Sequence, residues 1–328
     1  MPLFSSIGAA NTQTTNRGNE RGWARARVIT HGYVAGGYKD SSPWKNVNRT
    51  VHSTDTTTDL GDQMTKAAAY CDGANSDLYF YVYGIIDAFA GNSAETWSWH
   101  MSTSTGRGTN ASWNMTVGRD DLGTMVDYEH QGARIYCVGG GSNVTDRFNM
   151  KTETMLSVGP TSGSSSDYTA SAEGRLRGWQ VTSTAATRAT QSFQWSNETY
   201  SAWSSAPGTD GWGKAVSSYL GRFYMKNGGN LNATLVKCDD NNGTQSSSFT
   251  VQDAGEENYQ MGNLKAYCLG HYNTAQNNNT YKVNYNVDTY AALGATAEPK
   301  GHAGMSSAAL ASSYNFNNPA YGTTVPAY

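Results

Sequence analysis

Apolar and polar residues alternate along short stretches of the chain, as they do in half-buried β-strands. In TYKVNYNV (residues 280–287), Tyr281 and Val283 fall on one face of an extended chain, and Lys282 and Asn284 fall on the other. This period of two residues predicts a strand with one buried face. Comparable aromatic or apolar segments predict further strands at residues 47–54, 96–103, 145–153, 190–198 and 233–240.

A second kind of segment, an aromatic strand that ends in glycine, recurs upstream of these strands. GYVAGG (residues 32–37) has the counterparts YVYG (81–84), YCVGGG (136–141), YMKNGG (224–229) and YCLG (267–270), and RGWQVTS (177–183) is a degenerate sixth copy. Successive copies are roughly 40 to 55 residues apart, which is the spacing of four-stranded repeat units. Polar-to-small segments, such as residues 213–222 and 301–313, lead into another strand of most units.

Six such units predict an all-β fold, a single β-propeller with six four-stranded blades. A four-stranded sheet of about 45 residues cannot bury both faces alone, whereas a radial arrangement packs each face on a neighbour. We expect the tyrosine–glycine strand to be the innermost strand of each blade. Its tyrosine is expected to pack between blades with a partner for the hydroxyl. The closing strand comes either from residues 20–29 or from residues 306–316, and the sequence leaves both alternatives open.

Composition supports strands and narrows the range of partners. The 36 glycines and 21 tyrosines suit tight turns and pleated sheets. Only 15% of residues are charged and the formal net charge is -3, which argues against nucleic acid or an anionic membrane as a partner. No stretch approaches the roughly 20 apolar residues that span a bilayer, and the N-terminus lacks the pattern of a secretory signal. We expect an N-terminal arm (1–22), the propeller (23–313) and a C-terminal tail (314–328).

The sequence predicts neither an enzyme nor a cofactor or metal site. The six histidines lack metal-ligand spacing, and the four cysteines, which form no CxxC motif, are predicted to be free and buried. Cys137 and Cys268 occupy equivalent positions in opposite units, so we expect no disulfide between them. VGGGSNVTD (138–146) superficially suggests a phosphate cradle, but no helix is predicted to follow it. CDDNNGT (238–244) favours a polar hairpin over a calcium loop.

The tryptophans divide into two groups by their surroundings. Trp97 and Trp99 lie two residues apart on a predicted strand, so they share a face that we expect to pack between blades. Trp203 and Trp212 lie in a segment rich in glycine and serine and are the candidate surface contacts, where an indole ring can stack on a sugar.

The first unit resembles the kelch-like repeat, in the diverged form found in structural proteins of tailed bacteriophages and of cyanophages in particular. It has the GYxxGG strand, a polar loop, VNRTVHSTDTTTDLG (47–61) and the small-residue segment AAAYCDG (67–73). Units three, five and six match in part, unit two lacks the double glycine, and unit four lacks almost the whole motif. The resemblance extends over roughly residues 28–313.

The resemblance implies a virion structural protein: a tail fibre, tail-tip, neck or capsid-associated component that is assembled in the host cytoplasm. Its expected partners are other virion proteins, bound through the terminal arms, with self-association and host attachment as further expectations. Because propellers host many functions, a second hypothesis from another class stays open. It is a glycan-binding module or adhesin that recognises host-surface carbohydrate.

Overall fold

The computed structural model describes most of the repeat region. The described residues are 29–39, 42–76, 79–85, 92–101, 103–127, 134–159, 168–174, 176–183, 188–207, 215–218, 222–227, 234–250, 258–261, 265–273, 275–284, 287–295 and 306–311. The predicted arms, residues 1–22 and 314–328, lie outside these residues.

The fold is all-β: six four-stranded antiparallel sheets and one two-stranded ribbon. The sheets are numbered in chain order, and the strands are given in their order within each sheet. Sheet 1 contains β26 (Ser306–Ala311), β1 (Ile29–Ala35), β4 (Asn46–Val51) and β5 (Thr56–Asp62). Sheet 2 contains β6 (Asp72–Asn75), β7 (Tyr79–Tyr83), β8 (Thr96–His100) and β9 (Thr105–Thr109). Sheet 3 contains β10 (Leu122–Asp127), β11 (Arg134–Gly139), β12 (Asp146–Asn149) and β13 (Thr154–Ser157).

The remaining sheets follow the same order. Sheet 4 contains β14 (Tyr168–Glu173), β15 (Arg177–Ser183), β16 (Arg188–Gln194) and β17 (Thr199–Ala202). Sheet 5 contains β18 (Ala215–Ser218), β19 (Arg222–Asn227), β20 (Thr234–Asp239) and β21 (Gln245–Thr250). Sheet 6 contains β22 (Asn258–Met261), β23 (Lys265–Asn273), β24 (Ala275–Asn284) and β25 (Thr289–Ala295). The ribbon pairs β2 (Tyr38–Lys39) with β3 (Ser42–Pro43), and one short 3₁₀ helix, η1, spans Ala111–Trp113.

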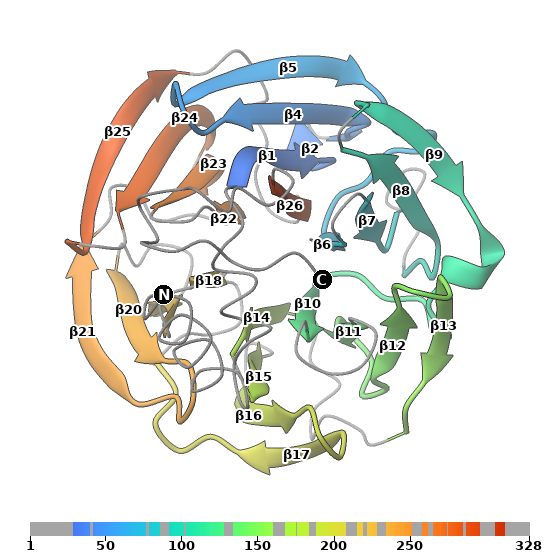
Figure 1. The fold of residues 1–328 in the computed structure, drawn as a ribbon, viewed down its shortest axis with the longest axis vertical. Coiled ribbons are helices and arrows are strands. Elements are labelled where there is room, and N and C mark those ends of the chain that lie inside the picture. Colours follow the sequence, from blue (N-terminus) through green and yellow to red (C-terminus); the bar gives the residue numbers. More distant parts are fainter. Residues whose placement is uncertain are drawn as a thin grey trace, which may run out of the picture.

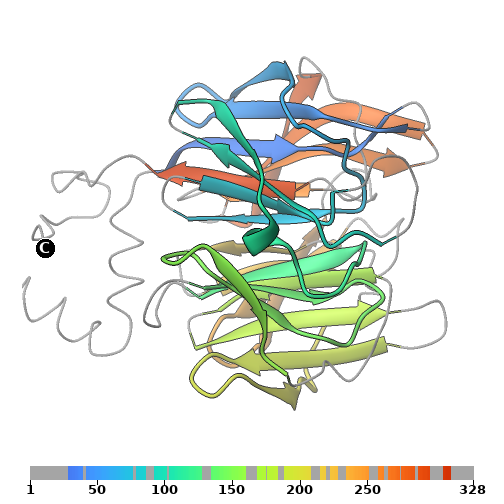
Figure 2. The same ribbon diagram turned by 90° about the vertical axis from the view of Figure 1, so that its right-hand side faces the viewer.

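The six sheets stand around a common centre (Figure 1), and the side view shows their strands running across the thickness of the disc (Figure 2). The first strands contact one another in the order β26, β6, β10, β14, β18 and β22, and β22 also contacts β26. The strand predictions for residues 47–54, 96–103, 145–153, 190–198, 233–240 and 280–287 are confirmed, since each segment overlaps the third strand of a sheet.

The prediction that the tyrosine–glycine strand is innermost is wrong. This strand is the second in each sheet, and a first strand of small or polar residues, such as Asp72–Asn75 or Ala215–Ser218, lies nearer the centre. The physical reason is space at the centre, where the first strands converge: β6 (DGAN), β18 (AVSS) and β26 (SSAALA) carry small side chains.

The first sheet combines the two ends of the described chain. Residues 306–311 do form a strand, but β26 pairs with β1 of sheet 1 and does not complete sheet 6, whose four strands are all contiguous in sequence. Of the two closing segments considered, 306–316 therefore supplies the added strand; residues 20–28 lie outside the described residues. Ile29 is paired with Ala311, so the first and the last described residues lie side by side in sheet 1.

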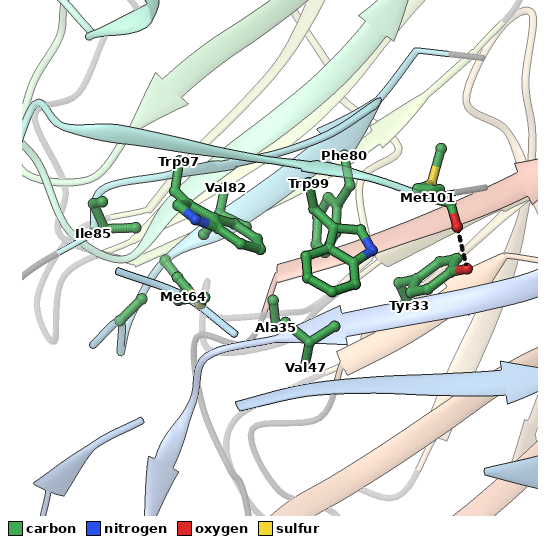
Figure 3. Close-up of a cluster of buried hydrophobic side chains, with 12 residues drawn as sticks. Tyr33, Ala35, Val47, Met64, Phe80, Val82, Ile85, Trp97, Trp99 and Met101 are labelled. Atoms are coloured by element: carbon green, nitrogen blue, oxygen red, sulfur yellow. Dashed lines mark hydrogen bonds between the residues drawn. The ribbon is translucent and has the colours of Figure 1, made fainter. Parts of the chain in front are cut away.

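The core lies between neighbouring sheets. One cluster joins sheet 1 to sheet 2 and contains Trp97 and Trp99, both of which are buried, with Tyr33, Ala35 and Val47 opposite them (Figure 3). The prediction that these two tryptophans pack between sheets is confirmed. The outermost strands are mostly exposed, for example β13 and β17.

Candidate functional site

Each sheet contacts the next through an aromatic side chain in its second strand. Tyrosines occupy this position in five sheets and are all buried: Tyr33, Tyr81, Tyr136, Tyr224 and Tyr267. Each hydroxyl donates a hydrogen bond to the hairpin between the third and fourth strands of the following sheet. The prediction that these tyrosines pack between units with a hydroxyl partner is confirmed.

In four of these contacts the acceptor is a carboxylate. Tyr81 donates to Glu153 at 2.8 Å, Tyr136 donates to Glu198 at 2.9 Å, and Tyr224 donates to Asp288 at 2.7 Å. Asp55 accepts from Tyr267, and this contact joins the last sheet to the first. We call these four groups the tyrosine–carboxylate clusters.

The carboxylates occupy equivalent turn positions with unusual backbone geometry. Asp55, Glu153, Glu198 and Asp288 have φ between 49° and 55°, in the left-handed region that glycine adopts most easily. A non-glycine residue costs of order 1 kcal/mol or more in this conformation. A carboxylate at this strained position indicates that its side-chain contacts offset the cost.

Cations complete the clusters. Glu153 forms a two-bond contact with Arg107 at 2.7 and 2.9 Å, and Asp55 accepts from Lys265 and from Lys282. Burial alone would raise the pKa of Asp55, but hydrogen bonds from Lys265, Lys282 and Tyr267 outweigh it and hold the pKa well below its usual range. Asp55 is therefore ionised at neutral pH, and the hydrogen bonds that it accepts are charge-assisted.

Hydrogen bonds with Arg107 likewise lower the pKa of Glu153, against the smaller effect of burial. For Asp288, burial opposes the lowering, and the bonds from Lys237 and Tyr224 prevail. Burial raises the pKa of Tyr136 and Tyr224, so these phenols stay protonated and act as donors.

In the two remaining contacts the described acceptor is a backbone oxygen. Between sheets 1 and 2, Tyr33 donates to the backbone oxygen of Met101 at 2.7 Å (Figure 3), and Ser104 occupies the left-handed turn position. Between sheets 4 and 5, Trp179 replaces the tyrosine and donates to the backbone oxygen of Asp240 at 3.4 Å. A Cβ atom on Gly243 would lie only 2.6 Å from the Trp179 ring, so the larger indole occupies the space of the missing side chain.

The candidate surface contact at Trp203 is wrong, because this side chain is only 3% exposed. Its ring lies 5.0 Å from Trp179 and 5.9 Å from Phe223 between ring centroids, and its Nε1 donates to the backbone oxygen of Gly243 at 3.2 Å. The hairpin between β20 and β21 of sheet 5 therefore covers Trp203, although the sequence around this residue is rich in glycine and serine. Trp212 lies outside the described residues.

The glycine-rich loop at residues 138–146 surrounds a cation of the chain itself. Arg119 is fully buried and donates to the backbone oxygens of Cys137, Gly139 and Val144, at 3.3, 3.4 and 2.8 Å. Its guanidinium also forms an ion pair with buried Asp146 at 2.5 Å. A phosphate cradle presents N–H groups to an anion. This loop presents carbonyl oxygens to Arg119, so its polarity is the opposite of a phosphate site.

The other motifs have structural roles. Asp239 accepts from the backbone N–H groups of Asn241 and Asn242 at 2.9 and 3.1 Å, which confirms a polar hairpin at residues 238–244. Cys71, Cys137 and Cys238 are free and buried, as predicted, whereas the side chain of Cys268 lies outside the described part of the structure. Burial raises the pKa of Cys238 to about 12.

Within the described part of the chain, no group of three or more His, Cys, Asp or Glu side chains is arranged to hold a metal ion. None of the helical residues described forms a segment long and apolar enough to cross a membrane.

Sequence reasoning missed the carboxylate of the repeated contact, although a signal for it exists. The turn residue is followed by threonine in TDT (54–56), TST (103–105), TET (152–154), NET (197–199) and VDT (287–289). Hydroxyl groups on either side of the turn residue hydrogen-bond to each other at 2.7 Å in the second motif and 2.8 Å in the third. The triplet is a short repeat inside the longer one.

Comparison with known proteins adds no assignment. Neither a scan against models of protein families nor a search of curated proteins finds a match for this chain.

Proposed function

We propose that the six sheets form a closed β-propeller of kelch-like repeats, and that the chain is a structural protein of a bacteriophage virion without enzymatic activity. Mutual contacts of the six first strands and the pairing of β26 with β1 support the closed ring. In this proposal the protein is a tail-fibre, tail-tip, neck or capsid-associated component that assembles in the host cytoplasm.

The observation that carries the proposal is the pairing of Ile29 with Ala311. In each of sheets 2 to 6 the first and second strands are consecutive in the chain, whereas in sheet 1 the two terminal segments take the place of that connection. The first and last described residues thus lie side by side, and in this proposal two arms attached at these points bind one neighbouring protein together. Linking two weak attachments raises their combined affinity without any new contact.

The clusters suit a protein built into a particle. Inter-sheet bonds repeated around the ring make a rigid body, and a rigid body transmits force between the proteins it joins. The glycan-binding alternative is weaker, because Trp203 is buried and only Trp212 of the two candidate rings remains to be tested.

The test is to locate the protein in intact particles. Quantitative mass spectrometry and imaging of purified virions are expected to find it at a fixed copy number in one position. Removal of residues 1–22 is expected to abolish incorporation, while the truncated protein keeps its circular dichroism spectrum. A protein that is absent from washed particles, or that binds host cells and glycans without being incorporated, would contradict the structural role.

A further inference from the structure

The contact between sheets 6 and 1 differs from the other five in chain connectivity. In sheets 2 to 6, the first strand is followed in the chain by the second strand of the same sheet. β26 follows β25 of sheet 6 in the chain and belongs to sheet 1 only through its hydrogen bonds to β1. The described chain therefore does not continue from β26 into the sheet that it completes.

Two non-covalent features hold this contact. The first is the antiparallel pairing of β26 with β1, from Ile29 and Ala311 to Ala35 and Ser306. The second is the tyrosine–carboxylate cluster at Asp55, which joins residues more than 200 positions apart in sequence: Lys265, Tyr267 and Lys282 all donate to Asp55.

The Asp55 cluster bonds sheet 6 to sheet 1 at several points. Lys265 also donates to the backbone oxygen of His52 at 2.7 Å, and the His52 ring lies 4.7 Å from the Tyr267 ring between centroids. The apolar cluster described at this contact consists of Val34, Tyr267 and Leu293. The carboxylate is about one quarter exposed, so water can reach the cluster when the sheets separate.

We propose that the Asp55 cluster is the clasp of the fold: it holds sheet 6 against sheet 1, and its opening releases β26 from its place between these two sheets. β26 contacts β22 of sheet 6 as well as β6 of sheet 2, so movement of sheet 6 removes one of its neighbours. Loss of that neighbour opens one side of β26 to water, so that its hydrogen bonds to β1 exchange faster. This inference does not depend on what the terminal segments bind.

Glu198 provides a matched control in the same chain. It accepts from one tyrosine and two cations, as Asp55 does, with Arg134 at 3.2 Å, Arg147 at 2.5 Å and Tyr136 at 2.9 Å. Its contact joins sheets 3 and 4. In each of these sheets the four strands follow one another in the chain. A loss of charge at Glu198 therefore weakens a contact between sheets without touching the closing strand.

The test is hydrogen–deuterium exchange with mass spectrometry on the full chain carrying Asp55→Asn or Glu198→Gln. Asp55→Asn is expected to speed exchange in β26 and β1 about tenfold or more, the effect of losing one charge-assisted contact, and to leave β10–β17 unchanged. Glu198→Gln is expected to leave β26 at the wild-type rate.

Lys282→Met provides a milder variant, since Asp55 keeps Lys265 and Tyr267 as donors. It is expected to speed exchange in the same two strands by a smaller factor. Wild-type exchange of β26 in folded Asp55→Asn or Lys282→Met protein would overturn the proposal, and so would equal acceleration of β26 by Glu198→Gln.

Discussion

The buried ion pair between Arg119 and Asp146 gives the sharpest test of how the third sheet is held. Both side chains are 0% exposed, and Asp146 uses both carboxylate oxygens as acceptors. One oxygen accepts from Arg119 and from the backbone N–H of Thr116 at 3.1 Å, and the other accepts from the Thr116 hydroxyl. Asp146→Asn keeps the shape and removes the charge: the amide oxygen still accepts from Arg119 and from the Thr116 N–H, the NH₂ group faces the Thr116 hydroxyl, which accepts as well as donates, and Arg119 loses its counter-ion.

The expected cost follows from this geometry. Removing one partner of a buried ion pair costs about 3–5 kcal/mol, because the other charge is left without its counter-ion. The carbonyl oxygens of Cys137, Gly139 and Val144 still solvate Arg119 and keep the cost within that range. Since a whole domain is stable by only about 5–15 kcal/mol, Asp146→Asn is expected to remove a large part of the free energy of unfolding.

The assay is urea unfolding followed by tryptophan fluorescence, with the slope of the free energy against urea checked for constancy. Glu95→Gln is the matched control, because its ion pair with Lys66 at 2.5 Å is partly exposed and contributes at most about 1 kcal/mol. If Asp146→Asn costs no more than Glu95→Gln, the reasoning about this pair is refuted.

Three further predictions follow from named contacts. Gly36→Ala is expected to lower the free energy of urea unfolding by about 1–3 kcal/mol more than Gly159→Ala. Both glycines have positive φ, but only at Gly36 would a Cβ atom lie 2.7 Å from the Ala68 oxygen. Equal costs of the two substitutions would contradict this reasoning. Trp203→Ala is expected to lower the free energy of unfolding by about 3–5 kcal/mol, whereas an exposed ring would cost almost nothing. Asp288 has a lowered pKa in the folded chain, so its contribution is complete above about pH 4 and falls as the pH drops through the folded value. Asp288→Asn is expected to flatten that part of the stability–pH curve, and an unchanged curve would exclude the contact with Lys237 as its cause.

The third strands and the inter-sheet tyrosines could be predicted because their signals are local. Alternation in a segment such as residues 96–103 reflects burial of one face of a strand. An aromatic residue repeated at similar spacing reflects one packing position that recurs from sheet to sheet. The first strands could not be placed in this way. Segments such as Asp72–Asn75 carry small or polar residues and no alternation, since both their faces lie in the narrow centre.

The error at Trp203 and the pairing of β26, which the sequence left open, have the same physical origin. Trp203 is followed by SSAPG, and that local composition favours a loop, but its burial is decided by Gly243, which is 40 residues away. β26 is placed in sheet 1 by pairing with a strand almost 280 residues earlier, and no short-range pattern encodes that partner. In both cases the deciding contact is between units, whereas the sequence pattern describes what happens within a unit.

The two inter-sheet contacts with a backbone acceptor show how neighbouring sheets accommodate a change of residue in one unit. A tyrosine leaves room at its hydroxyl for the side chain of the next hairpin, and charge-assisted bonds fill that room in four contacts. The indole of Trp179 occupies the space that these polar contacts take elsewhere. The facing hairpin has Gly243, where any side chain would collide with the indole. Met101 and Ser104 provide a third solution, in which a backbone oxygen accepts the bond from Tyr33. Residues facing each other across a contact are therefore matched in volume and in hydrogen bonding. This matching, rather than the identity of any one residue, explains how unit four can have Trp179 in place of the tyrosine and still pack against the next sheet.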